Sequence, residues 1–176
     1  MACVLTSGRS EPCSDAIGGI KKLYLLDYIE DSFTVAAGEA TAINVGVTAV
    51  YGYDLLNDGN TFAEAFEQDI NAGTSTYIQT VTLALKKQSK LFAQELALIV
   101  KARPIAVVLD RMDNYKIVGI SDGTVSSGSL ESGGAKNEFN GINLVLTATE
   151  TEPAPYLDAA TETAFIALID ASPETP

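Results

Sequence analysis

Carboxylates dominate the side chains that could do chemistry in this sequence. There are 23 Asp and Glu residues against 11 Lys and Arg, and there is no histidine. The absence of histidine excludes Ser-His and Cys-His catalytic pairs and every histidine metal site. A pair of carboxylates or a Ser-Lys pair remains for catalysis. The acidic residues that lie close together in sequence are Asp54, Asp58, Glu64 and Glu67 and, around a turn, Asp110 and Asp113.

These carboxylates are interpreted as surface charges. Glycoside hydrolysis requires two carboxylates held across a cleft, and among 23 acidic residues close pairs arise by chance. Asp and Glu are also mostly exposed in folded proteins. We therefore predict no catalytic residues and no enzymatic activity. A carboxylate hydrolase remains the alternative that an Asp110→Asn or Asp113→Asn variant would test.

Metal and cofactor sites have no sequence support. Cys3 and Cys13 are the only cysteines, and zinc would need two further carboxylate ligands, an uncommon structural site. A disulfide between the two would close a short loop, whereas cytoplasmic conditions favour free or buried thiols. Asp113 and Asn114 lack the alternating spacing of a calcium loop. Lys136 follows a Gly-Gly pair without the Gly-Lys-Ser/Thr ending of a phosphate-binding loop.

Composition narrows the class of protein. The chain has 176 residues, of which 47% are hydrophobic, and a formal net charge of −12. Such a surface disfavours binding to nucleic acid or to anionic membranes, because both rely on Lys and Arg. The acidity fits either an abundant soluble protein or a surface that stays close to DNA without sticking to it. Without a targeting signal or a run of about 18 to 20 apolar residues, we expect a soluble protein made in the cytoplasm.

The sequence of the first half of the chain predicts mainly strands and turns. Residues 1–19 lack periodicity and are expected to form an arm. Alternation and β-branched or aromatic residues predict strands over 20–28, 32–35, 43–55 and 61–70. Residues 57–60, Asn-Asp-Gly-Asn, predict a hairpin turn.

The second half contains the clearest elements. The strand at 76–87 has an apolar face and a threonine-rich face. A helix is predicted over 89–102, capped by Ser89 and ended by Pro104. Three further strands are predicted, over 105–110, 115–120 and 139–149. A flexible Gly/Ser-rich loop is predicted over 121–134.

The order of elements predicts a mainly β fold. It fits an antiparallel β-sandwich or barrel with one flanking α-helix at about 89–102. We expect an N-terminal arm at 1–19, a β-sandwich domain at 20–150 and an acidic Pro/Thr-rich tail at 151–176. An apolar island within that tail, residues 164–169, is expected to dock on a neighbour.

From Val50 to about Pro155 the arrangement resembles the tail-tube proteins of tailed bacteriophages, and tubes of contractile injection and secretion machines are similar. The residues that carry the resemblance are 53–60, 76–85, the following helix, 115–123, the Gly/Ser stretch and 139–146. The resemblance implies a virion structural protein with no catalytic residues and no cofactor. It also implies hexameric rings that stack, with sheets joined into an inner barrel that conducts the genome.

The same resemblance implies partners. These are further copies of the chain, other tail proteins and genomic DNA that passes without specific binding, and no membrane. The threonine-rich faces of 76–86 and 141–149 are candidate walls for the lumen. Lysines around the helix either pair with acidic surfaces of a neighbouring subunit or balance local charge; they are Lys86, Lys87, Lys90 and Lys101.

Two alternatives stay open, one within the structural class and one outside it. One is a different virion component, such as a tail terminator or a head decoration protein. The other is a non-viral β-sandwich module that binds carbohydrate or protein, although such modules usually expose Trp or Tyr platforms and this chain has no Trp. Open tubes, as against closed single rings or monomers, would discriminate among these classes.

Overall fold

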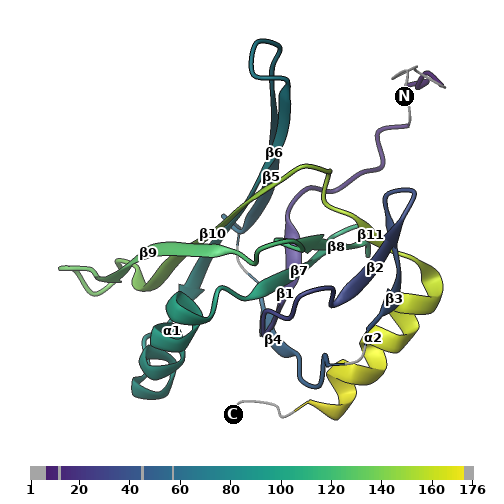
Figure 1. Cartoon of the computed structure of the whole chain (residues 1–176). Helices are drawn as coiled ribbons and strands as arrows, with labels where there is room; N and C mark the ends of the chain where they lie inside the picture. Colours follow the sequence, from purple (N-terminus) through teal and green to yellow (C-terminus); the bar gives the residue numbers. More distant parts are fainter. Residues whose placement is uncertain (1–6, 12, 45, 57, 173–176) are drawn as a thin grey trace.

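The computed structural model describes residues 7–11, 13–44, 46–56 and 58–172. These residues form eleven strands and two helices (Figure 1). The elements are β1 (Ile20–Leu26), β2 (Phe33–Ala36), β3 (Glu39–Ile43), β4 (Tyr51–Asp54), β5 (Thr61–Asp69), β6 (Thr74–Lys86), α1 (Lys90–Ala102), β7 (Ile105–Asp110), β8 (Tyr115–Val118), β9 (Val125–Ser132), β10 (Asn140–Glu150), β11 (Tyr156–Leu157) and α2 (Ala159–Ala171).

The strands belong to two sheets. A seven-stranded sheet has the order β2-β3-β11-β8-β7-β1-β4, and a four-stranded sheet has the order β5-β6-β10-β9. The fold is therefore mainly β and sandwich-like, as predicted. The alternative of a closed barrel is wrong for the single chain, because both sheets end in open edge strands.

The central strands of the seven-stranded sheet, β1 and β7, are buried on both faces. Leu23 and Leu25 of β1 pack into a core shared with Val81 and Leu144 of the four-stranded sheet. Tyr24 and Leu26 pack into a second core on the opposite face with Phe165 of α2. A strand with two buried faces needs apolar residues at every position rather than at alternate ones. This explains the uninterrupted Ile-Ala-Val-Val-Leu of β7, in which all five side chains are buried.

Helix α1 covers the open end of the sandwich, between the two sheets. Ser89 caps it, since the Ser89 Oγ accepts a hydrogen bond from the Phe92 N–H at 3.1 Å. The helix ends where Arg103 adopts a left-handed conformation with φ of 51° directly before Pro104. Phe92 and Leu96 then pack against the core between the sheets. The predicted helix and its cap are confirmed.

The C-terminal segment corrects the prediction of a tail at 151–176. Strand β11 pairs with β3 and β8 inside the seven-stranded sheet, and α2 covers that sheet's second face. Phe165 has no exposed surface, and its ring lies 5.5 Å from that of Tyr24 and 5.9 Å from that of Tyr115, measured between centroids. The fold thus has two flanking helices, and the apolar island at 164–169 contributes to this chain's own core.

Three further predictions are wrong in part. Of the strand expected over 43–55, only β4 forms within 46–56. The turn at 57–60 joins no hairpin, because β4 and β5 belong to different sheets; its residue 57 lies outside the described residues. The loop expected at 121–134 contains β9, eight residues paired along β10.

Candidate assembly surfaces

One face of the four-stranded sheet carries small, mostly uncharged side chains. Residues on β6 alternate between the core and this outer face: Val81 and Leu83 are fully buried, while Thr80 and Thr82 are part-exposed. The ladder registers extend the outer face across all four strands, and neither helix packs on it. Its central residues are Ala63, Ala65, Ile78, Thr80, Thr82, Ala84, Val125, Ser127, Ser129, Asn143, Val145, Thr147 and Thr149.

Charged side chains lie at the two ends of this outer face. Glu67 and Asp69 pair with β6 near its beginning, and Lys86 and Glu131 flank Gly141 near its end. The Glu131 carboxylate accepts hydrogen bonds from the Ser129 hydroxyl at 2.7 Å and from the Asn143 amide at 2.9 Å. These bonds lower the pKa of Glu131, so it stays ionised. The middle of the outer face is a neutral surface of hydroxyls and methyls.

Both edges of the four-stranded sheet are long and open. Strands β5 and β9 have nine and eight residues and one neighbour each. The Gly133 N–H donates to the Phe139 carbonyl oxygen. Since hydrogen-bonded pairs alternate along an antiparallel ladder, residues 126, 128 and 130 of β9 direct their N–H and C=O groups away from β10. Monomeric proteins usually protect such an edge with lysine, proline or short strands, and β9 contains neither Lys nor Pro.

A polar contact joins the two sheets beneath this face. Gln79, which is 1% exposed, accepts a hydrogen bond from the Gly119 N–H at 3.1 Å and donates to Glu64 at 3.3 Å. Glu64 also accepts from the Ala154 N–H at 2.7 Å. Glu150, 5% exposed, accepts from the Ser121 N–H at 3.1 Å. These bonds satisfy buried polar groups and hold the four-stranded sheet in one position on the other sheet.

The acidic residues singled out in the sequence serve local structure. The Asp110 carboxylate accepts hydrogen bonds from the Met112 and Asn114 N–H groups in the turn between β7 and β8. Asp113 pairs with Lys21 at 2.9 Å, on the exposed surface. This turn confirms the predicted hairpin.

The second acidic group is not one cluster. Asp54 pairs with Lys22 at 3.0 Å on the seven-stranded sheet, and Asp58 lies 4.0 Å from Arg111. Glu64 and Glu67 are on opposite faces of β5. Sequence reasoning treated Glu64 as a surface charge and missed its contact with Gln79, because only the sheet pairing brings the two together. The structure thus holds these carboxylates apart.

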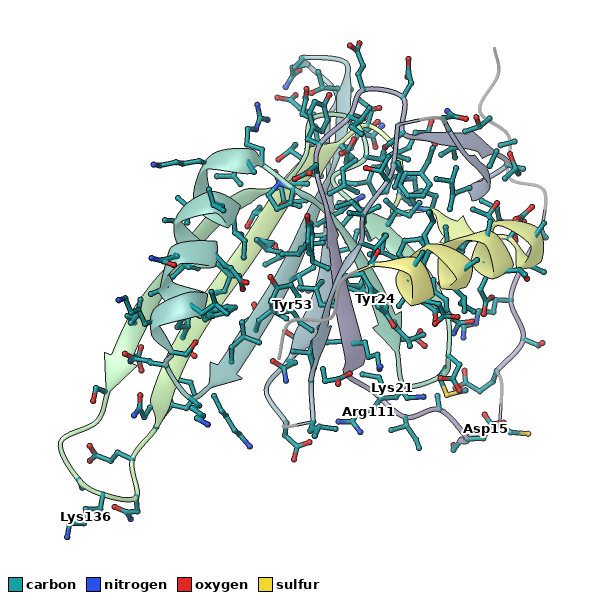
Figure 2. The ribbon with its side chains drawn as sticks, turned by 90° about the horizontal axis from the view of Figure 1, so that it is seen from below. Asp15, Lys21, Tyr24, Tyr53, Arg111 and Lys136 are labelled. Carbon is teal, nitrogen blue, oxygen red and sulfur yellow. The ribbon has the colours of Figure 1, made fainter. Side chains whose placement is uncertain are left out.

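The remaining candidate ligands are also dispersed. Within the described residues no three Cys, Asp or Glu side chains lie close enough to hold a metal ion. Cys13 is exposed and free, whereas Cys3 lies outside the described residues. Lys136 lies at the tip of the hairpin between β9 and β10, as Figure 2 shows, and not in a strand-to-helix turn.

A cleft runs between α1 and the edge strand β4. Near Leu98 and Pro104 it has a volume of about 280 Å³, and near Leu56 and Lys87 about 500 Å³. Tyr53 lines both parts, and its ring packs on that of Phe92 at 6.1 Å between centroids. Burial, and next the charge of Glu95, raises the pKa of Tyr53 to about 12, so the phenol is neutral at physiological pH.

Comparisons with protein-family models, curated proteins and solved structures gave no match. Neither helix in the described part of the chain is both long and apolar enough to cross a membrane. Any functional assignment therefore has to come from the surfaces described above.

Proposed function

We propose that this chain is a structural subunit that assembles through its four-stranded sheet into rings and tubes, as the tail-tube subunits of bacteriophages do. The observation that carries the proposal is the four-stranded sheet itself. It is buried on one face, neutral and uncovered on the other, and open along two long edges. A monomer that exposes such edges is prone to pair with other chains.

Strand direction supports closure into a ring. Each strand of the four-stranded sheet is antiparallel to its neighbour, and the number of strands is even, so β5 and β9 run in opposite directions. Copies related by rotation about an axis along the strands therefore bring β9 beside β5 of the next copy in antiparallel pairing. The two edge strands are also offset: β5 lies along 74–82 of β6, whereas β9 lies along 140–147 of β10, opposite 80–86. Such a stagger is what a closed barrel requires.

In a closed ring the outer face lines the lumen. Its hydroxyl and methyl groups give a phosphate backbone few cations to bind, and the net charge of −12 disfavours retention of DNA on the protein. We propose that the tube conducts a phage genome in the virion tail without binding it. A hexameric ring, as the resemblance implies, would place four strands from each copy in one barrel.

Electron microscopy of the purified chain at high concentration tests the proposal. We expect rings and open tubes. Single closed rings would instead favour a tail terminator, and monomers alone would contradict the proposal.

A pair of variants links the assembly to the edge strand. Leu130→Pro removes an N–H that points away from β10, and Leu130 is already 53% exposed, so the intrachain ladder is retained. We expect a folded monomer. Leu130→Ala keeps the N–H and should still assemble; if the proline variant also assembles, β9 is not the interface.

A further inference from the structure

Strand β6 connects two surfaces of opposite character. At its first residue, Thr74, the hairpin formed by β5 and β6 projects beyond the body of the protein, and at its last residue, Lys86, it enters the cleft beside α1 (Figure 1). Thirteen residues at about 3.3 Å each separate these surfaces by about 40 Å. The two surfaces therefore lie at opposite ends of the four-stranded sheet.

The hairpin tip is apolar and acidic. Phe66 and Ile70, at the end of a projecting hairpin, are 79% and 85% exposed. Large apolar side chains that are exposed together often mark a contact with another protein. Glu67 and Asp69 lie beside them, and no Lys or Arg occurs between residues 61 and 85. The Asp69 carboxylate also accepts hydrogen bonds from the N–H groups of residues 71 and 72, which holds the turn.

The cleft at the other end is apolar and basic. Tyr53, Leu56 and Phe92 line its 500 Å³ part, and Leu56 is 91% exposed. Lys86 and Lys87 line the same part, and Lys90 begins α1 next to it. The ion pairs among the described residues involve Lys21, Lys22 and Arg111. No carboxylate in this described part of the chain therefore pairs with the lysines of the cleft. Asp54, which also lines the cleft, is already paired with Lys22.

We infer that the hairpin tip of one copy docks in the lysine-lined cleft of a second copy in the next ring. The tip supplies apolar side chains and carboxylates, and the cleft supplies an apolar lining and ammonium groups, so the two surfaces match in apolar character and are opposite in charge. Because the contact joins different surfaces at opposite ends of one molecule, it is head-to-tail and does not close on itself. Rings related in this way stack without limit, with a repeat of at most about 40 Å.

This inference rests on the proposed function, since rings formed through the sheet edges are what align the hairpins along one axis. The two are separable by experiment. Disrupting the axial contact should leave single rings, whereas disrupting the edge strands should leave monomers.

A charge exchange tests the axial contact. Glu67→Lys and Lys86→Glu, each alone, should shorten tubes to single rings or short stacks. We expect the association constant between rings to fall by at least about tenfold, which corresponds to about 1.4 kcal/mol for each ring-to-ring interface, and mean tube length to fall with it. The double variant, which restores opposite charges across the interface, should recover long tubes. Tube length is measured by electron microscopy, and the proportion of rings by analytical ultracentrifugation.

Matched controls carry the same charge changes away from the contact. Lys101→Glu lies at the other end of α1, and Glu152→Lys lies on the exposed segment after β10; both should form tubes of normal length. Denaturation curves establish that each variant is folded. Normal tubes from both single variants, or a double variant no longer than the singles, would overturn the axial contact alone. Monomers from the unmodified chain would overturn it together with the proposed function.

Discussion

The two sheets of this protein differ in how completely the chain itself covers them. The seven-stranded sheet has the core between the sheets on one face and α2 on the other, and its edge strands β2 and β4 have four residues each. The four-stranded sheet has one bare face and two long open edges. Figure 2 shows the two sides of the covered sheet: Tyr24 lies on the side of α2 and Tyr53 on the side nearer α1.

This difference separates folding from assembly. The seven-stranded sheet concentrates the buried apolar surface that stabilises a monomer. The four-stranded sheet contributes one face to that core and leaves its backbone hydrogen-bonding groups available along both edges. Substitutions should therefore change the free energy of unfolding in the first sheet and the state of assembly in the second.

The largest expected effect on stability is at Phe165. Phe165→Ala removes a side chain with no exposed surface from beneath α2, which should lower the free energy of unfolding by about 3–5 kcal/mol. The matched substitution Phe66→Ala, at a side chain 79% exposed on the hairpin tip, should change it by less than about 0.5 kcal/mol. Guanidinium denaturation followed by circular dichroism measures both. An equal loss in the free energy of unfolding at the two positions would contradict the conclusion that the seven-stranded sheet provides most of the stability.

The contact that joins the sheets should have an intermediate effect. Gln79→Leu keeps the size of the side chain but leaves the buried Gly119 N–H without its acceptor, at a cost of about 1–3 kcal/mol. Its sequence neighbour is the control, since Thr80→Ser changes only the outer face. A Gln79→Leu variant as stable as the unmodified protein would show that packing alone holds the sheets together.

Alkaline pH should weaken the seven-stranded sheet through its tyrosines. Burial raises the pKa of Tyr115 to about 12, as it does that of Tyr53, from 10.0. A raised pKa means that the folded state favours the neutral phenol, so this stabilisation is complete below pH 10 and is lost as the pH rises towards 12. Because both phenols are only partly removed from solvent, screening limits the loss to about 1 kcal/mol per tyrosine.

Phenolate absorbance during a pH titration checks this expectation, with Tyr53→Phe as the comparison. The variant should lose one late-titrating group and keep that of Tyr115. Complete ionisation of all tyrosines near pH 10 in the folded protein would contradict it.

The smallest effect on stability is expected on the outer face. Thr82→Lys should change the free energy of unfolding by no more than about 0.5 kcal/mol, because the side chain is directed away from the core. The consequence should appear in the assembled tube instead. A lysine at this position lines the proposed lumen, so tubes of the variant should retain duplex DNA at low salt and release it at high salt. Thr82→Ser tubes are the control, and DNA retention equal in both would place Thr82 outside the lumen.

Regular alternation and local capping were sufficient to predict several elements. The apolar face of β6, including Gln79, and that of β10 are confirmed, as are α1 with its Ser89 cap and the hairpin of β7 and β8. In each of these, side chains within a few residues of one another decide the conformation. The two faces of the four-stranded sheet were therefore predictable before their neighbours were known.

Strand β9 was not predicted from the local sequence pattern, which indicated a loop. Its Val-Ser-Ser-Gly-Ser sequence has low strand propensity and is typical of a loop. It forms a strand because each of its residues has a pairing partner on β10. The glycine at 128 allows this close pairing, since a Cβ there would collide with the Asn143 carbonyl oxygen. The pairing that makes β9 one of the two open edges is a long-range property, and the sequence of the segment alone does not contain it.

Helix α2 is the second case. The Pro, Glu and Thr residues around it resemble a tail, and its apolar residues do not form a narrow stripe. Asp158 caps the helix through the Thr161 N–H at 2.7 Å, a signal that was present but weak. The position of α2 is set by packing against the second face of the seven-stranded sheet, where Phe165 is buried.

The sequence by itself determined the β-rich class, the lack of histidine chemistry, the acidic charge and the alternating faces of β6 and β10, because these depend on composition and on residues close in the chain. Only the tertiary structure decided which sheet is covered, which edges stay open and which ends of β6 carry opposite charge. Those features depend on segments such as β9 and α2, whose conformation is set by burial against distant strands rather than by their own residues.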